Sequence, residues 1–286
     1  MSTDVRRVTP SNDLLGEGPW WDDQAGTLVW VDIRSRAVRS WTPGQAEVTS
    51  RFLPDEVSLA LPCADGRRVV GQVDRLALDD GENLEALCEI DPGNEHTRVN
   101  DGVCDDRGRL WVGTYSTRGE PEATLYVVTP DGQARAVLTG LVASNGVGWS
   151  PDGTVLYATD TGRSRIDRFT LSEDGSELRP DGTLMSSTEG DGRPDGLAVD
   201  AEGRVWTAMW SGGSVRCYAP NGGLLAEVPV PVTYPTSVCF GGPDLATLFV
   251  TTGTIHLAED HDEPHAGAVL AFEPGVRGVA VRRFGV

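Results

Sequence analysis

The stretch "CDDRGRLWVGT" (residues 104–114) places acidic residues and a turn glycine, Gly108, directly before an alternating apolar strand pattern. Four further copies have the same form: "WDDQAGTLVWVD" (21–32), "PCADGRRVVGQ" (62–72), "SPDGTVLYATD" (150–160) and "DAEGRVWTAMW" (200–210). A degenerate sixth copy, "GGPDLATLFVTT" (241–252), has no turn glycine and aligns near Ala246. Each copy predicts a tight hairpin between two short strands.

The spacing of the copies indicates how the hairpins are organised. Successive turn glycines lie 40, 42, 45 and 50 residues apart, and further strand patterns such as "TLYVVTPDG" (124–132) lie between them. Units of this length with four strands are typical of β-propeller blades. Six units in 286 residues predict an all-β, six-bladed β-propeller that forms a single domain over residues 1–286. A β-sandwich with regular hairpins is the alternative.

The amino-acid composition limits which kinds of molecule this protein can bind. The formal net charge is −19, which argues against nucleic acid and anionic membranes as partners. All 24 basic residues are Arg, so a Schiff-base lysine is excluded. The N-terminal residues contain no apolar stretch, and the five scattered Cys form no C-x-x-C pair. We therefore expect a reduced, cytoplasmic protein, a monomer or weak homodimer, that acts on a small molecule.

Polar residues share a register relative to the turn glycines. Asn100, Asn145 and Asp195 each stand eight residues before the turn glycine of their unit, and Glu17 stands nine before its own. This position is the entry of the innermost strand of a blade, so these residues should converge at one mouth of the central channel. Carboxylate and amide oxygens suit hard cations. Glu17, Asn145 and Asp195 are therefore candidate ligands of one divalent metal, with Ca²⁺ favoured and Zn²⁺, Mn²⁺ or Mg²⁺ as alternatives.

The same segments carry a family resemblance. "GEGPWWDD" (16–23), "RVNDGVCDDRGRLWVGT" (98–114), "SNGVGWSPDGTVLYATDT" (144–161) and "PDGLAVDAEGRVWTAMWSGGSV" (194–215) resemble, in order, the senescence marker protein/gluconolactonase/luciferin-regenerating enzyme family, which includes regucalcin. The resemblance implies a six-bladed propeller with one divalent metal in its channel, held by Glu17, Asn145 and Asp195. It further implies that Asp195 is the catalytic acid/base and that Arg98 and Asn100 bind substrate, with Asp101 a weaker match.

One position departs from the sugar lactonases that are similar to regucalcin. Those proteins carry a substrate-binding Glu shortly after the "GT" of the third block, whereas "GTYSTRGEPE" (113–122) places Arg118 near that position. If Arg118 faces the channel, its guanidinium favours a substrate with an anionic group. A solvent-facing loop position is the alternative for Arg118.

The resulting hypothesis is a hydrolase, a gluconolactonase-like enzyme of carbohydrate metabolism that opens a sugar-acid lactone. The metal would polarise the lactone carbonyl, and Asp195 would handle the proton of the attacking water. Two alternatives remain open: a phosphotriesterase similar to diisopropyl-fluorophosphatase, and a non-catalytic calcium-binding regulatory protein.

Two other features of the sequence give weaker indications of function. "HLAEDHDEPH" (256–265) holds three His but lacks a regular metal-ligand spacing, so a solvated loop is expected there. Most Trp residues lie on strand patterns and should fill the gaps between blades, whereas Trp210 follows a strand and is a candidate for the pocket wall.

Overall fold

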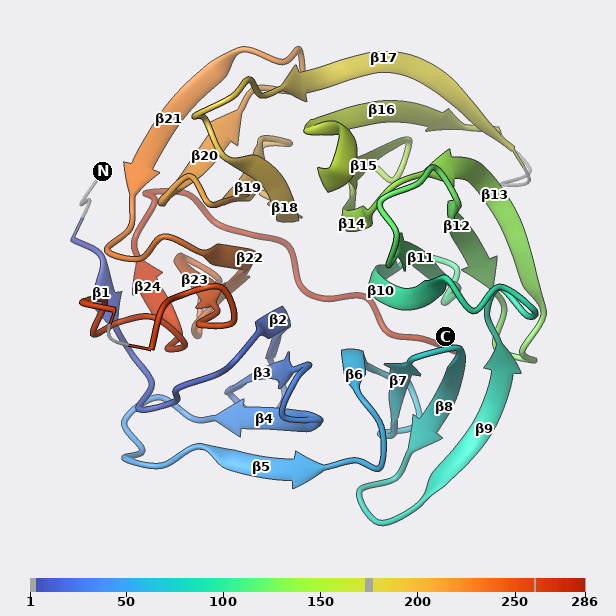
Figure 1. The fold of residues 1–286 in the computed structure, drawn as a ribbon, viewed down its shortest axis with the longest axis horizontal. Helices are drawn as coiled ribbons and strands as arrows, with labels where there is room; N and C mark the ends of the chain where they lie inside the picture. The colour runs from blue at the N-terminus through green and yellow to red at the C-terminus, as the bar shows by residue number, and fades with distance from the viewer. Residues whose placement is uncertain (1–3, 173–176, 260, 286) are drawn as a thin grey trace.

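The strands of this chain form six four-stranded antiparallel sheets arranged around a central axis, as Figure 1 shows for the computed structural model, which describes residues 4–172, 177–259 and 261–285. The predicted all-β, six-bladed propeller is confirmed. These described residues contain 24 strands and one short 3-10 helix, η1 (Thr161–Arg163). Within them no helix combines the length and the apolar character that crossing a membrane requires.

Each blade runs from an innermost strand at the axis to an outer strand at the rim, and blades are numbered in chain order. The innermost strands are β2 (Gly16–Asp22), β6 (Val57–Pro62), β10 (Thr97–Cys104), β14 (Ser144–Trp149), β18 (Arg193–Val199) and β22 (Pro235–Gly241). The second strands are β3 (Thr27–Asp32), β7 (Arg68–Gln72), β11 (Leu110–Ser116), β15 (Val155–Asp160), β19 (Val205–Trp210) and β23 (Thr247–Thr252). The third strands are β4 (Ala37–Trp41), β8 (Arg75–Asp79), β12 (Ala123–Val128), β16 (Arg165–Leu171), β20 (Ser214–Tyr218) and β24 (Leu270–Phe272). The outer strands are β5 (Thr49–Phe52), β9 (Leu84–Glu89), β13 (Ala134–Leu141), β17 (Leu178–Ser186), β21 (Leu224–Pro229) and, in blade 6, β1 (Arg6–Arg7).

The two ends of the chain close the ring within blade 6. The N-terminal strand β1 pairs with β24, with Arg6 opposite Ala271 and Arg7 opposite Leu270. Blade 6 therefore combines three C-terminal strands with one N-terminal strand. Separating blade 1 from blade 6 requires breaking this pairing, so the closure holds the ring together.

The hairpins between innermost and second strands form where the repeat predicts them. The five turn glycines have φ between 64° and 89°, a region that side chains with a Cβ rarely adopt. In the degenerate sixth copy Leu245 takes this conformation, with φ 55°. A non-glycine residue there costs about 1–2 kcal/mol, so the sixth turn is formed at a local conformational cost.

Two hairpins are fixed by a buried aspartate. In blade 5, Asp200 Oδ1 accepts hydrogen bonds from the backbone N–H groups of Glu202 and Arg204, at 2.9 Å each. Its Oδ2 accepts from Arg204 Nε at 2.7 Å and from Trp206 Nε1 at 2.9 Å. Asp105 makes the equivalent set of bonds in blade 3. One carboxylate thus ties the turn, the arginine and the core tryptophan of each unit together.

Aromatic side chains fill the gaps between blades, as predicted. Trp111 of blade 3 packs edge-on against Trp149 of blade 4, with ring centroids 5.1 Å apart. Trp206 of blade 5 contacts Phe240 of blade 6 in the same way, at 6.3 Å. These contacts bury large apolar area between neighbouring sheets and stabilise the ring.

The C-terminal segment, residues 273–285, crosses one end of the channel after blade 6 (Figure 1). It makes backbone hydrogen bonds to four blades: Ala201 N–H to Arg277 O, Gly278 N–H to Leu245 O, Phe284 N–H to Pro62 O and Gly285 N–H to Gly108 O. The segment therefore covers the channel end opposite the strand entries and connects blades on both sides of the ring.

The buried aspartates predict a large effect on stability. Asp200→Ala should lower the free energy of unfolding by about 3–5 kcal/mol, because it leaves the Arg204 guanidinium and the Trp206 N–H without their buried acceptor. Urea denaturation followed by tryptophan fluorescence measures this change. Asp152→Ala is the matched control: Asp152 caps the blade 4 hairpin but is exposed, and its loss should cost about 1 kcal/mol or less. Equal effects of the two substitutions would contradict the role of the buried carboxylate.

Candidate active site

Every innermost strand has a break in its hydrogen-bond register near its start. The breaks lie between Glu17 and Trp20, Val57 and Leu59, Val99 and Gly102, Ser144 and Val147, Pro194 and Leu197, and Pro235 and Ser237. A β-bulge leaves residues unpaired and turns their side chains away from the sheet. The irregularity recurs in all six blades, and in blades 1, 3, 4 and 5 it places polar side chains in one cavity at the axis.

The bulges explain which blades supply candidate ligands. Asn100, Asn145 and Asp195 lie inside the breaks of blades 3, 4 and 5, and Glu17 stands at the start of the break in blade 1. The corresponding breaks of blades 2 and 6 hold Ser58 and Thr236, whose hydroxyls are weaker metal ligands.

Glycines beside the candidate ligands let neighbouring innermost strands approach closely. A Cβ on Gly146 would lie 2.6 Å from the carbonyl oxygen of Asp195, and one on Gly196 would lie 2.0 Å from Ser237 Oγ. No side chain fits at such distances. These two glycines hold the bulges of blades 4, 5 and 6 against one another, and thereby set how near Asn145 and Asp195 lie.

The bulges open into a cavity of about 770 Å³, here called the mouth cavity. This volume is within the range of sites that enclose a small molecule. The predicted residues that line it are Glu17, Arg98, Asn100, Asn145, Asp195 and Trp210. The mouth cavity therefore brings together residues of blades 1, 3, 4 and 5 at the channel mouth.

The candidate ligands have the features of a cation site. Glu17, Asn145 and Asp195 are only 4–9% exposed. Asn145 Oδ1 and Asp195 Oδ1 are buried without a hydrogen-bond partner among the described residues. A buried oxygen without a donor is costly, and a hard cation offsets that cost. The described residues contain no group of three or more His, Cys, Asp or Glu side chains able to hold a metal, and the predicted set differs from such a group in including the amide oxygen of Asn145.

Repulsion between carboxyl groups adds to this cost. Burial, followed by repulsion from Asp101, raises the pKa of Glu17 to about 8. Burial raises the pKa of Asp195 well above its usual range, and the charges of Glu17 and Asp101 add to the shift. The three carboxyl groups share one desolvated region, which a divalent cation would stabilise in its ionised form.

Arg98 is held beside this region. Its Nη1 donates to Asn100 Oδ1 at 2.8 Å and to the carbonyl oxygen of Val99 at 3.1 Å, and its guanidinium carbon lies 4.8 Å from the centre of the Tyr115 ring. Asn100 Nδ2 donates to the carbonyl oxygen of Ser144 at 2.9 Å, so Asn100 links blade 3 to blade 4. Burial lowers the pKa of Arg98. Asn100 thus positions Arg98 as well as lining the cavity.

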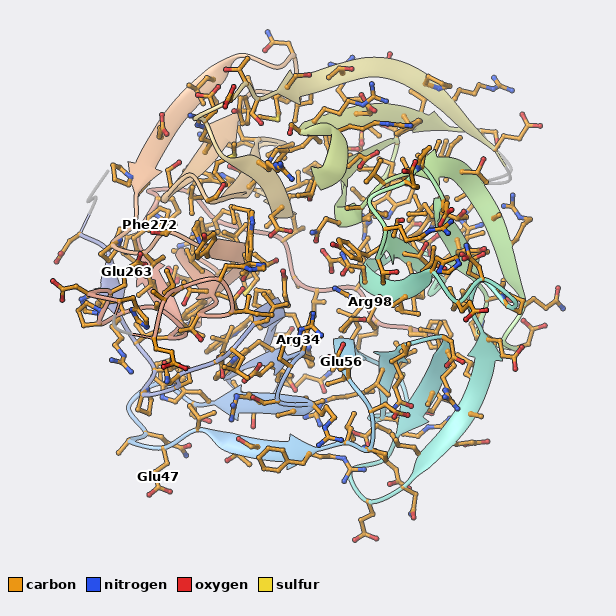
Figure 2. The ribbon with its side chains drawn as sticks, in the orientation of Figure 1. Arg34, Glu47, Glu56, Arg98, Glu263 and Phe272 are labelled. Atoms are coloured by element: carbon orange, nitrogen blue, oxygen red, sulfur yellow. The ribbon has the colours of Figure 1, made fainter. Side chains whose placement is uncertain are left out.

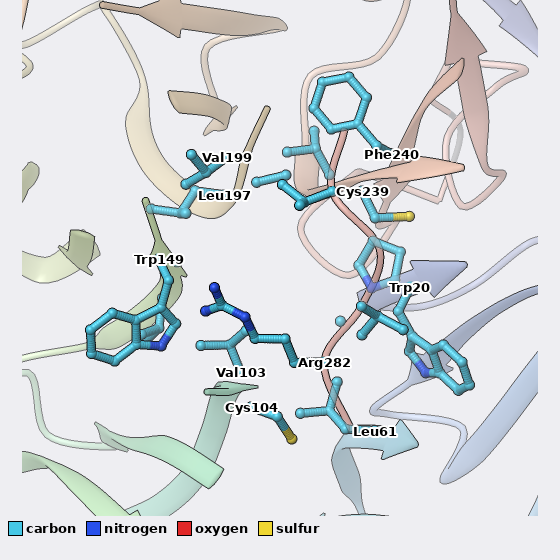
Figure 3. A pocket seen from close by; sticks show the side chains of 18 of the residues that line it. Trp20, Leu61, Val103, Cys104, Trp149, Leu197, Val199, Cys239, Phe240 and Arg282 are labelled. Carbon is cyan, nitrogen blue, oxygen red and sulfur yellow. The ribbon is translucent and has the colours of Figure 1, made fainter. Parts of the chain in front are cut away.

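Asp101 lies on the other side of the candidate ligands. It lines a second cavity of about 160 Å³, the back cavity, with mainly apolar walls. Figure 3 shows this cavity with Arg282 of the C-terminal segment extending into it. Asp101 Oδ1 accepts from the backbone N–H of Gly102 at 2.7 Å, and burial raises the pKa of its carboxyl to about 6. The structure therefore places Asp101 behind the ligands and outside the mouth cavity.

The structure does not bring Arg118 to the mouth cavity. Its neighbours Thr117 and Gly119 line that cavity, but the Arg118 side chain forms an ion pair with Glu122 on the outer surface. The loop places Arg118 on the side opposite to Thr117 and Gly119, and the ion pair with Glu122 holds its guanidinium there. The expectation that Arg118 faces the channel is therefore not met.

Several residues of the mouth cavity were not predicted from the sequence. They are Arg34, Glu56, Glu95, Tyr115, Arg193 and His256. Their positions follow one rule: they stand just before an innermost strand, at its first residue, or at or just after the end of a second strand. Innermost and second strands are antiparallel, so these two kinds of position meet at the same mouth. Applying that rule to the repeat would have identified most of them.

The close approach of the innermost strands predicts a sensitive position. Gly196→Ala should push the blade 5 bulge away from Ser237 and displace Asp195, lowering calcium affinity at least about tenfold and stability by about 1–3 kcal/mol. Calorimetric titration with Ca²⁺ and urea denaturation measure the two effects. Gly223→Ala, at an exposed surface turn where an added Cβ would meet only Asn221 Oδ1 at 3.4 Å, should change neither. Unchanged calcium affinity in Gly196→Ala would contradict the proposed packing constraint.

Comparisons with known proteins agree with this geometry. Residues 15–254 match the family model described as SMP-30/Gluconolactonase/LRE-like region. The chain is 32% identical over 285 residues to 6-deoxy-6-sulfogluconolactonase of Pseudomonas putida, covering 98% of each protein. It is 34% identical over 257 residues to a pentonolactonase of Haloferax volcanii, covering 87% of this chain and 84% of that protein.

A solved structure supports the same relationship. The calcium-binding protein regucalcin from Agrobacterium tumefaciens superposes with a TM-score of 0.90 at 29% identity, over 98% of this chain and 97% of that one. The family match extends over most of the chain and includes all four blades that supply the candidate ligands and Arg98. The chain belongs to the SMP-30/gluconolactonase/LRE-like family.

Proposed function

We propose that this protein is a divalent-cation-dependent sugar lactonase, which hydrolyses the cyclic ester of a sugar acid to the open-chain acid. The observation that carries the proposal is the convergence of Glu17 with the unpartnered oxygens of Asn145 and Asp195 at a cavity that also holds Arg98. A protein that only scaffolds other proteins has no need of this arrangement.

The relatives support the reaction class. Two of them are named for lactone hydrolysis, one on a sulfonated gluconolactone and one on a pentonolactone. Their substrates differ in length and charge, so lactone opening is what they share. The relative named as a calcium-binding protein supports Ca²⁺ as the cation.

Glu17, Asn145 and Asp195 would hold the cation through two carboxylates and one amide oxygen, a donor set that suits Ca²⁺. When bound, such a cation supplies Lewis-acid polarisation of the lactone carbonyl and offsets the charge that develops on its oxygen.

Asp195 acts as the general base of the proposed reaction. Its carboxylate accepts the proton of the water that attacks the lactone carbonyl, and returns a proton to the ring oxygen as the ester bond breaks. The bulge directs this side chain to the cavity, and Gly196 keeps its backbone close to blade 6. The position of the base is therefore set by backbone packing.

Arg98 orients the substrate. Its Nη1 is held by Asn100 and by the carbonyl oxygen of Val99, and its ring contact with Tyr115 limits rotation. Within the described residues its other N–H groups have no hydrogen-bond acceptor, so they are available to substrate hydroxyl or carbonyl oxygens. A guanidinium fixed in this way aligns the lactone for attack at little entropic cost.

Removal of the cation tests the proposal directly. Treatment with EDTA should abolish lactone hydrolysis, and Ca²⁺ should restore it. Calcium at about 100 times its Kd should stabilise the fold by ~2.7 kcal/mol, or about 5 °C in Tm. Glu17→Gln should weaken calcium binding about 100-fold because it removes one ligand charge. Full activity in the metal-free protein would overturn metal dependence.

Asp195 is both a proposed cation ligand and the proposed base, so the effect of replacing it on turnover is measured at a Ca²⁺ concentration that saturates the variant. Asp195→Asn should lower kcat/KM for a lactone by about 100- to 10,000-fold, since the amide cannot accept the proton. Asp152→Asn, in an exposed hairpin turn, is the matched control and should leave activity unchanged. Calcium binding without hydrolysis of any lactone would instead indicate a regulatory protein, and hydrolysis of an organophosphate alone would indicate a phosphotriesterase.

A further inference from the structure

Three arginines line the mouth cavity, each from a different blade. Arg34 follows β3 of blade 1, Arg98 lies in β10 of blade 3, and Arg193 begins β18 of blade 5. Figure 2 shows Arg34 and Arg98 near the central axis, with Glu56 between them. The cavity of a strongly acidic chain is thus lined by several cations.

Two of these arginines have no acidic partner. Most arginines of the described chain form ion pairs with Asp or Glu, and Arg34 pairs with Glu56 at 2.6 Å. By contrast, no carboxylate of the described residues forms an ion pair with Arg98 or Arg193. Arg98 bonds only to neutral oxygens, although it is partly buried. Arg193 is exposed and Arg98 is partly buried, and neither guanidinium forms an ion pair with a carboxylate of the described residues, so an anionic group of a ligand would supply that partner.

The charges around the mouth leave a net attraction for anions. A divalent cation would balance Glu17 and Asp195. The remaining charged side chains that line the mouth cavity are the three arginines, Glu56 and Glu95. Asp101 lines the back cavity instead. Among the side chains that line the mouth cavity, the three arginines therefore outnumber Glu56 and Glu95 by one, with Asp101 the nearest further acid, while the whole chain has a formal net charge of −19.

The position of Arg193 relative to Asp195 fits one particular ligand shape. The two residues are two positions apart at the start of β18, about 6–7 Å along an extended strand. Arg193 pairs across the strand with Trp210, whose ring packs against Tyr234 at 4.7 Å and His256 at 5.6 Å, and Trp210 and His256 also line the cavity. A lactone whose carbonyl is near Asp195 can extend its far end along this wall toward Arg193.

We propose that Arg193, together with Arg98, forms a subsite for an anionic group on the lactone. The preferred substrate is then a sugar lactone bearing a carboxylate, phosphate or sulfonate away from its carbonyl. The inference rests on the proposed lactonase function. Guanidinium groups suit all three oxyanions because their paired N–H donors match two oxygens at once. Trp210 and His256 provide the apolar surface beside the sugar chain.

The test compares matched neutral and anionic lactones on the full chain loaded with Ca²⁺. The neutral probe is glucono-δ-lactone; the anionic probes are the lactone of glucaric acid and the gluconolactones phosphorylated or sulfonated on the last carbon. For at least one anionic probe, kcat/KM should exceed that of the neutral probe by about tenfold or more, and added salt should reduce the difference. Comparing the three anionic probes also shows which of the carboxylate, phosphate and sulfonate groups the subsite prefers.

Substitutions in and near the subsite test whether it causes the preference for anionic lactones. Arg193→Gln should lower the ratio of anionic to neutral kcat/KM about tenfold, and Arg193→Glu should lower it further. Glu56→Gln, which frees Arg34 of its partner, should raise the ratio about threefold. Arg135→Gln, on the exposed outer strand of blade 3, is the matched control and should leave the ratio unchanged. An unchanged ratio in Arg193→Gln, or a lower ratio in Glu56→Gln, would overturn the inference.

The design separates this inference from the proposed function. Equal hydrolysis of neutral and anionic lactones would overturn the anionic subsite and leave the lactonase proposal intact. If no lactone is hydrolysed, the lactonase proposal fails, and calorimetric binding decides the subsite. Phosphorylated gluconate should then bind more tightly than gluconate to the wild type but not to Arg193→Gln; equal binding of the two acids would overturn the subsite.

Discussion

The burial of three carboxyl groups close together at the axis is the constraint around which this molecule is built. Glu17, Asp101 and Asp195 come from different blades and share one region with little solvent. Such groups remain together only if the backbone holds them there. The bulges direct the side chains inward, and the contacts at Gly146 and Gly196 keep the bulges from moving apart. The stability of the ring therefore maintains an electrostatically unfavourable centre, which the proposed cation would relieve.

The ring can hold these carboxyl groups in place because separate contacts fix its closure, its hairpins and the packing between its blades. Strand β1 joins β24 at the rim, aromatic rings fill the spaces between blades, and buried aspartates fix two of the hairpins. These features lie away from the mouth cavity. The mouth itself is built from strand starts, strand ends and short loops, where side chains change without altering the sheets. Arg34 and Arg193 lie there, so under the proposed function a substitution that changes substrate preference need not disturb the sheets.

Much of the fold could be predicted because each blade contains its own local signal. The turn glycines gave the repeat, and counting back from them located Glu17, Asn145 and Asp195 at the entries of the innermost strands. The pairing of β1 with β24 could not be predicted, since a strand of two exposed arginines has no apolar pattern and depends on a partner over 260 residues away. The sequence left open whether Arg118 faces the channel or solvent, for a related reason. Loop direction depends on local contacts such as the pair with Glu122, which spacing does not encode.

The C-terminal segment has a consequence for the path of molecules through the channel. It bonds to four blades across one end, and Arg282 fills part of the space behind Asp101. The segment obstructs that end of the channel, so the mouth cavity offers the direct route for substrate and product. Substrate enters and product leaves by the same route, past the same arginines, so the next molecule waits for the previous one to depart. The acid formed by lactone opening carries a new negative charge through that opening, and its departure becomes a step of the catalytic cycle in its own right.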